Sequence, residues 1–303
     1  MKSVFTTTMV KFFLILNVLL FIFISGPYAD ERGHGEHLHD AHSVKAHSPA
    51  GSGISISMTS KPVNLRAGEA ATLRFSVKDG EGRPARGVSV SHDRILHVII
   101  ISEDLSLFAH VHPEDFGLVT KEMVRSAQFG VRYDFPKAGR YLVAADTAVD
   151  GTHISNQFMV EASGDNVMGA PRKDLSKEKK FGDYDVTFSS APEQITAKKE
   201  TVLRYEIKEN GRPVTDLETY LAAPMHIAVV LTDLGNFIHA HGSSPGAHTV
   251  RQPVGHIHGT SDSGLGPVIE AKVVFPVKGT YRIFSEVKHR GRVLLLDFMV
   301  DAE

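Results

Sequence analysis

Two stretches of the chain carry three histidines each, at the same spacing. The first is HVIIISEDLSLFAHVH at residues 97–112, and the second is HIAVVLTDLGNFIHAH at residues 226–241. In each stretch a histidine is followed 13 residues later by a second one, and two residues further on by a third. Neutral imidazoles are ligands that suit Zn(II) and Cu(II). The chain has no cysteine, so thiolate metal sites and thiol catalysis are excluded, and His, carboxylate, Met or backbone would have to hold any metal.

Each stretch reads as a β-hairpin with its histidines at the open end, because an apolar run, a short turn and a second apolar run follow one another. His110 and His112 are two residues apart on a strand, so both side chains point to one face. With an even-numbered loop about Asp104 and Leu105, His97 falls opposite His112, whereas a three-residue loop would send it to the other face. We therefore predict that three imidazoles converge in the first hairpin. The same arithmetic applies to the second set: His226, His239 and His241.

Further ligands are available near both hairpins. A water or a carboxylate, with Glu114 and Asp115 as candidates, would complete the first site. In the second copy the secondary candidates are His248, His256 and His258. The competing interpretation is that these are ordinary strand histidines, hydrogen-bonded or half-exposed. Three more histidines of the two copies lie outside the pattern. We expect His92 to be a loop residue, and His153 and His289 to lie at the surface.

The N-terminal region divides into two segments. In residues 1–29, Lys2 and Lys11 precede an apolar run that ends near residue 24, which is typical of a secretory signal peptide or, if uncleaved, an N-terminal anchor. Residues 30–52 lack the apolar side chains needed to offset ordering entropy, so we expect a disordered segment. Its histidines predict either a flexible, unselective metal collector or a solvated linker: His34, His37, His39, His42 and His47.

The rest of the chain contains two copies of one domain. Residues 71–78 and 201–208 alternate apolar and polar side chains, as half-buried strands do. Each copy continues with a Gly-Arg-Pro turn, the histidine hairpin, a Phe-Pro followed by Gly-x-Tyr, and a closing Phe-Met-Val. The offset between copies rises from 129 to 140 after the hairpin, so the second copy carries an insertion of about 11 residues. We assign domains to residues 53–162 and 181–303, joined by a linker at residues 163–180.

The short strands and turn signals predict an all-β chain of two tandem immunoglobulin-like β-sandwiches. Tyr141 and Tyr281 follow the Gly-x-Tyr pattern and are candidates for tyrosine corners; the alternative is a half-buried Tyr at a strand start. The histidine-led strand, the D-L-x-x-F turn, the H-x-H pair and the later F-P-x-x-G-x-Y together resemble the YtkA-like secreted bacterial domain, in both copies. The first copy has Pro113 after H-x-H and the second has Gly242, so the hairpin exits are expected to differ. The resemblance implies an extracytoplasmic β-sandwich with a metal site and no defined activity.

Three functions are compatible with these patterns. We favour an exported, non-enzymatic protein that binds copper or zinc and buffers or delivers it, with a metal-transport or envelope protein as partner. It would be periplasmic or secreted, and its only membrane contact would be an uncleaved N-terminal segment. A tandem adhesion or scaffold module with structural histidines is the first alternative, and a copper-dependent, superoxide dismutase-like enzyme is the second. The net charge of −2 indicates no basic face for nucleic acid.

Overall fold

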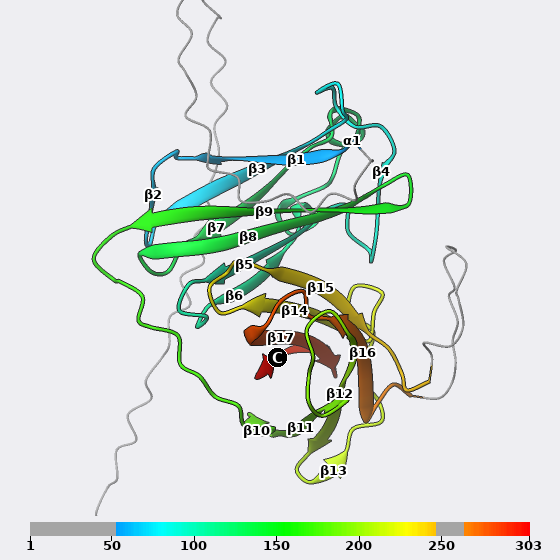
Figure 1. Ribbon diagram of the computed structural model, residues 1–303. Helices are drawn as coiled ribbons and strands as arrows, with labels where there is room; N and C mark the ends of the chain where they lie inside the picture. Colours follow the sequence, from blue (N-terminus) through cyan, green and yellow to red (C-terminus); the bar gives the residue numbers. More distant parts are fainter. Residues whose placement is uncertain (1–52, 247–263) are drawn as a thin grey trace, which may run out of the picture. The chain divides into compact units, whose positions relative to one another are not determined.

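The computed structural model describes residues 53–246 and 264–303 (Figure 1). The expected signal or anchor segment, the His-rich segment and the three secondary candidates of the second copy lie outside the described residues. In the part of the chain that is described, no helix is long and apolar enough to cross a membrane.

The first domain is a sandwich of two sheets. One sheet has the order β1-β3-β7, and the other has the order β2-β9-β8-β5-β6, with β4 paired to β8. The elements are β1 (Ser55–Lys61), β2 (Leu65–Arg66), β3 (Ala70–Lys78), β4 (Val88–Ser89), β5 (His97–Ser102), β6 (Phe108–Val111), the 3-10 helix η1 (Pro113–Phe116), α1 (Lys121–Ser126), β7 (Gln128–Asp134), β8 (Gly139–Val149) and β9 (Thr152–Ser163).

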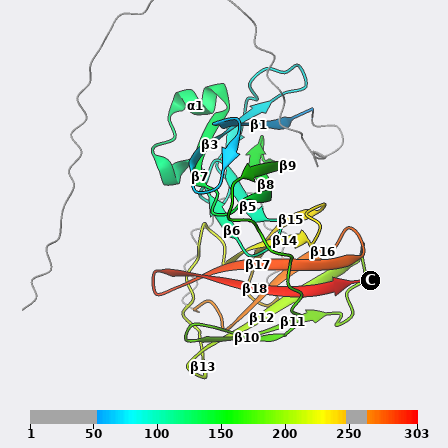
Figure 2. The same cartoon turned by 90° about the vertical axis from the view of Figure 1, so that its left-hand side faces the viewer.

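The second domain repeats this arrangement. Its outer sheet has the order β10-β11-β12-β13, with β16 paired to β12, and its other sheet has the order β15-β14-β17-β18. The elements are β10 (Glu178–Phe181), β11 (Tyr184–Ala191), β12 (Glu200–Glu209), β13 (Arg212–Pro213), β14 (Met225–Leu231), β15 (Phe237–Gly242), β16 (Val268–Val274), β17 (Gly279–His289) and β18 (Arg292–Ala302). In Figure 2, β17 and β18 form one layer and β11 and β12 the other. The all-β, immunoglobulin-like prediction is confirmed.

Each domain has its own apolar core, closed by a tyrosine corner. The Tyr141 hydroxyl donates to the carbonyl oxygen of Lys137 at 2.7 Å, and Tyr281 does the same to Val277 at 2.8 Å. Both rings are fully buried, so the hydroxyl would lack a partner without this return to the backbone. The two predicted corners are therefore confirmed. The short helix α1 was not predicted; Thr120 begins it by accepting a hydrogen bond from the backbone amide of Met123.

The central strands β5 and β14 are buried on both faces, along their whole length. In β5, Val98 and Ile100 point into the core of the first domain, while Ile99 and Ile101 point the other way. The second face is covered by a further apolar cluster that combines both domains: Ile99, Ile101, Leu105, Leu142, Ala144, Ala228, Val230, Leu234 and Phe284. Phe108 stacks on Phe284 with ring centroids 4.9 Å apart. The sheets that carry the two histidine hairpins thus pack against each other.

The predicted register of both hairpins is confirmed. In the first, Val98 pairs with Val111, which places His97 opposite His112 across a six-residue loop; in the second, His226 pairs directly with His241. The hairpin exits differ, as expected. Pro113 starts η1 in the first copy. In the second copy the strand continues through Gly242, where a Cβ would lie 2.5 Å from the Ile269 side chain, so only glycine fits.

Candidate metal centre

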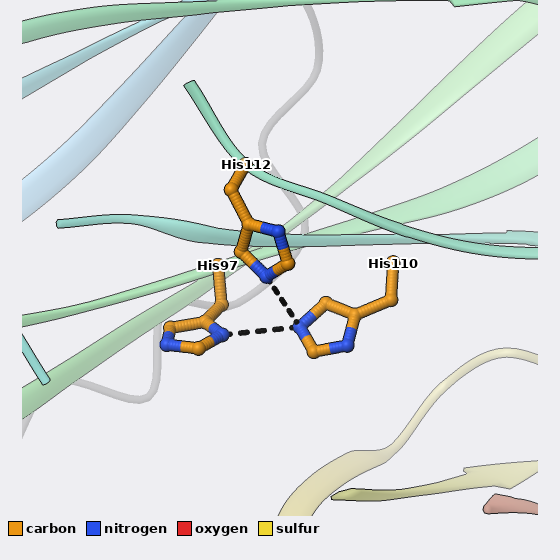
Figure 3. A group of neighbouring side chains, drawn as sticks. All are labelled: His97, His110 and His112. Atoms are coloured by element: carbon orange, nitrogen blue, oxygen red, sulfur yellow. Dashed lines mark hydrogen bonds between the residues drawn. The ribbon is translucent and has the colours of Figure 1, made fainter. Parts of the chain in front are cut away.

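The three histidines of the first hairpin converge at one point (Figure 3). His97 Nδ1 lies 3.0 Å from His110 Nε2, and His112 Nε2 lies 3.1 Å from that same nitrogen. His97 and His112 are almost fully buried, and the His110 side chain is 1% exposed. One nitrogen from each ring falls within 4.8 Å of the other two, a separation at which a single metal ion can bind all three.

The histidines of the second hairpin also lie together, but their closest grouping differs from the predicted one. Ring centroids of His226, His239 and His241 are 4.6–5.7 Å apart. The group whose nitrogens all fall within 4.8 Å contains His226 and His239 with His110 of the first domain, not with His241. The six predicted histidines therefore form one continuous group between the domains, which we call the six-histidine cluster: His97, His110, His112, His226, His239 and His241.

The outward-facing ring nitrogens of the first hairpin are held by acceptors. His97 Nε2 donates to the Ser91 carbonyl oxygen at 2.9 Å. His112 Nδ1 donates to Asp115 Oδ2 at 3.0 Å, and η1 positions this carboxylate by placing it three residues after His112. In a neutral imidazole only one nitrogen carries hydrogen, so the inner nitrogens of both rings are bare acceptors. Both point at His110 Nε2.

His110 cannot satisfy these two acceptors. Its outer nitrogen, Nδ1, lies 2.7 Å from Glu286 Oε2 of the second domain. Burial raises the pKa of Glu286 to about 8. If Glu286 is ionised, His110 donates to it and three bare nitrogens face one another. If Glu286 is protonated and donates, His110 Nε2 holds one hydrogen between two acceptors. In both states at least one inner nitrogen keeps a lone pair without a hydrogen of its own to accept, an arrangement that a bound cation relieves.

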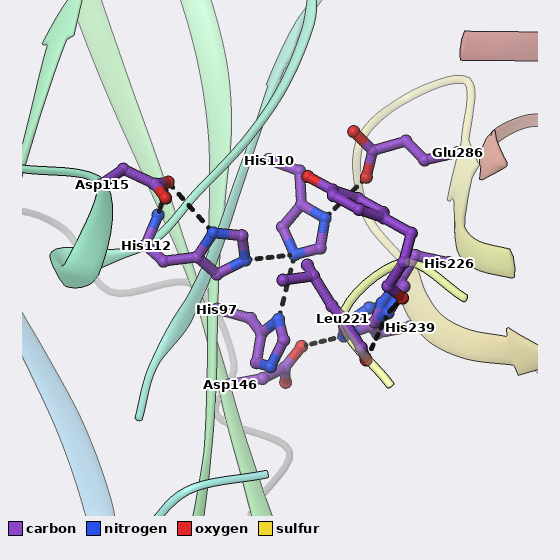
Figure 4. Close-up of polar contacts among 10 residues, drawn as sticks. His97, His110, His112, Asp115, Asp146, Leu221, His226, His239 and Glu286 are labelled. Carbon is purple, nitrogen blue, oxygen red and sulfur yellow. Dashed lines mark hydrogen bonds and ion pairs between the residues drawn. The ribbon is translucent and has the colours of Figure 1, made fainter. Parts of the chain in front are cut away.

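The second hairpin leaves its inner nitrogens without partners. His226 Nε2 donates to the carbonyl oxygens of Tyr220 and Leu221 at 3.0 and 3.2 Å, and His239 Nδ1 donates to Asp146 Oδ2 at 2.8 Å (Figure 4). His226 Nδ1, His239 Nε2 and His241 Nε2 are buried and have no hydrogen-bond partner. Buried polar atoms are rarely left unpaired, and several in one place indicate a missing ligand or ion.

Two carboxylates bond the outer ring nitrogens of histidines that belong to the other domain. Glu286 of the second domain supports His110 of the first, and Asp146 of the first domain supports His239 of the second. Asp146 and Glu286 occupy equivalent positions, 140 residues apart, on β8 and β17. Carboxylates that bind the far nitrogen of a metal-ligating histidine fix its tautomer and orientation. Each domain thus supplies part of the support for the other domain's histidines.

Burial lowers the pKa of five imidazoles of the cluster and so favours their neutral form: His97, His110, His112, His226 and His241. It lowers the pKa of His97 and of His110 to about 3 and that of His226 to about 2, with neighbouring histidines adding to the effect. Burial alone would raise the pKa of Asp146, but the hydrogen bond from His239 holds it below its ordinary value. The neutral imidazole is the form in which histidine binds a transition metal.

A cavity of about 410 Å³ opens beside the cluster, and two histidines outside the repeated pattern line it, His92 and His153. The His92 ring stacks on that of His241, with ring centroids 3.8 Å apart. The ring centroid of the exposed His153 lies 6.3 Å from that of His92. His92 is in a turn, as expected, at a positive φ of 49°. Its equivalent in the second copy is Leu221, so the repeat gave no signal for it.

Other sequence-based expectations are corrected here. Glu114 belongs to neither group of close ligand atoms, and its Oε1 accepts from the Ile95 backbone amide. Asp115 contacts the outer nitrogen of His112, so it supports a histidine instead of completing the site. His289 is fully buried and bonded to Tyr184 and Asp216, not at the surface. His153 is exposed, as predicted.

Comparisons with known proteins show the repeat but no function. A family described as a domain of unknown function (DUF8832) matches residues 49–164 and 179–303. The match identifies the two copies with this family, and the likeness to YtkA-like domains stays a resemblance of the hairpin motif. No curated protein matches the chain.

Solved structures give only remote likenesses. The Escherichia coli adhesin FdeC has 14% identity and a TM-score of 0.24, with 86% of this chain and 66% of that chain covered. Invasin, a bacterial integrin-binding protein, has 14% identity and a TM-score of 0.20, with 81% and 39% covered. The chain thus spans less than two thirds of either protein, and TM-scores this low carry no argument about function.

Proposed function

This chain belongs to the DUF8832 family, and from its own six-histidine cluster we propose that it is an exported, non-enzymatic protein that binds copper or zinc and buffers or delivers the metal. The observation that carries the proposal is the set of inner nitrogens: two opposed pairs in the first hairpin and three unpartnered atoms in the second. An all-imidazole site suits Cu(II) and Zn(II). Export is supported by the apolar run in residues 1–29, which follows two lysines.

The wider role rests on two further features. The histidines of residues 30–52 would collect metal with low selectivity, and the buried cluster would hold it in a defined geometry. We propose a metal-transport or envelope protein as the partner that supplies or receives the ion. The resemblance of the hairpin motif to YtkA-like secreted domains is consistent with a location outside the cytoplasm, either released or held by an uncleaved N-terminal segment.

Metal analysis of the full chain tests the proposal. All five histidines of residues 30–52 are replaced by Asn, so that only the folded domains report. After loading with Zn(II) or Cu(II) and gel filtration, this chain should retain metal, and a further variant with His97, His110 and His112 changed to Asn should lose it from the first hairpin. Retention no higher than that of a histidine-free protein would leave the adhesion or scaffold alternative. Superoxide dismutation by the copper-loaded chain would replace the non-enzymatic assignment.

A further inference from the structure

We propose that the two domains hold two transition-metal ions next to each other, in one dinuclear centre shared across their interface. This inference rests on the proposed function and deepens it: the sequence leaves open whether the two hairpins share a site, whereas the structure joins them. Metal centres of this kind bind two ions a few ångströms apart, at a distance of roughly 3.5–4 Å in many enzymes.

Imidazoles of different domains lie only slightly farther apart than imidazoles of the same hairpin. The His97 ring is 5.9 Å from that of His226 and 5.6 Å from that of His239, and His110 lies 5.5 and 5.6 Å from the same two rings. Within the first hairpin the corresponding distances are 4.5–5.3 Å. A ligated ion sits about 2 Å from its nitrogen, so two ions bound here are separated by well under about 10 Å.

The nitrogen atoms show the same continuity. His110 belongs to both groups of mutually close nitrogens, once with His97 and His112 and once with His226 and His239. One nitrogen binds one ion, so His110 serves only one of the two. An ion held by His97, His110 and His112 leaves His226, His239 and His241, whose ring centroids are 4.6–5.7 Å apart, for the second. The adjacent cavity leaves space for water or a small anion. A three-histidine shell with an open position is a common arrangement for Zn(II).

The two carboxylates behind the cluster also support one shared centre. Asp146 and Glu286 are 12% exposed at their side chains, and among the described residues the ion pairs that they form are with histidine only, not with Lys or Arg. Each carboxylate bonds the outer nitrogen of one histidine, which fixes the orientation of that ring and turns its other nitrogen toward the cluster. Because the two carboxylates cross between domains, neither domain completes its own half of the centre.

Copper paramagnetic resonance on the full chain tests this inference, with the five histidines of residues 30–52 replaced by Asn. Cu(II) alone is added from half an equivalent to three equivalents. We expect two tightly held ions, and at two equivalents a dipole-broadened spectrum with a half-field transition. Two sharp, uncoupled signals, or saturation at one equivalent, would overturn the dinuclear centre while leaving metal binding intact. Absence of any bound copper would instead remove the proposed function itself.

Zinc stoichiometry by native mass spectrometry gives a second measurement that needs no paramagnetic ion. The intact chain should bind two Zn(II), and the double variant His97→Asn, His112→Asn should bind one and lose the half-field copper signal. The matched control is His289→Gln, which changes a buried histidine bonded to Tyr184 and Asp216 away from the cluster. This control should keep both ions and the coupling; loss of coupling there would mean that the double variant reports damage to the fold.

Discussion

Replacing Asp146 by alanine should weaken metal binding in the other domain. The carboxylate accepts from His239 Nδ1 at 2.8 Å across the domain interface and is 8% exposed. Loss of such an outer partner typically lowers metal affinity 10- to 100-fold, or about 1.4–2.8 kcal/mol. The burial here favours the upper half of that range. Asp146→Asn keeps an acceptor oxygen but loses the charge, so its effect should be smaller.

The assay is a competition titration of Zn(II) against a chromophoric chelator, using the full chain with Asn at the five histidines of residues 30–52. The matched control is Asp104→Asn, since Asp104 is equally buried and bonded to Ser102, Ser106 and Lys137 but lies at the far end of the hairpin. It should lower stability and leave affinity unchanged. A loss of less than about threefold for Asp146→Ala, in a folded protein, would refute the role of the crossed carboxylates.

Three further predictions concern the interface, pH and the cavity. Phe284→Ala removes a buried ring that stacks on Phe108 and should lower the free energy of unfolding by about 3–5 kcal/mol, and metal affinity with it, as measured by urea denaturation and chelator competition. Burial lowers the pKa of His97 and His110 from 6.5 to about 3, so protons bind the unfolded chain more strongly. The metal-free protein should therefore be most stable above about pH 6.5 and lose stability as pH falls toward 3, and acid titrations followed by circular dichroism that show no such loss would contradict this. His92→Leu, which introduces the residue of the second copy, should speed metal release to a chelator in stopped-flow measurements, because the ring covering one side of the cluster is lost; an unchanged rate would place His92 outside the exit path.

The hairpins were predictable because their chemistry is local. Strand alternation and an even loop place His97 opposite His112, and the structure has this register. The internal repeat then predicted the second hairpin, and the Gly-x-Tyr pattern predicted the tyrosine corners. These features depend on contacts between residues near in sequence or on a pattern that occurs twice.

The joining of the two sites was not predictable in the same way. The decisive contacts link residues 93 and 176 positions apart, His239 with Asp146 and His110 with Glu286. A signal was nevertheless present: residues 97–102 and 225–231 are nearly unbroken apolar runs, which indicates strands covered on both faces. A strand facing solvent on one side would alternate. Those runs predict that something packs over each hairpin, although not that the covering surface is the other copy.

Anomalous X-ray diffraction from crystals of the zinc-loaded chain tests the central claim most directly, because it locates the ion without reference to affinity. Data collected at the zinc absorption edge should show anomalous density between His97 Nδ1, His110 Nε2 and His112 Nε2. The Zn–N distances should be about 2.0–2.1 Å. Anomalous density only outside the six-histidine cluster, with the rings of the cluster unchanged and unligated, would contradict it.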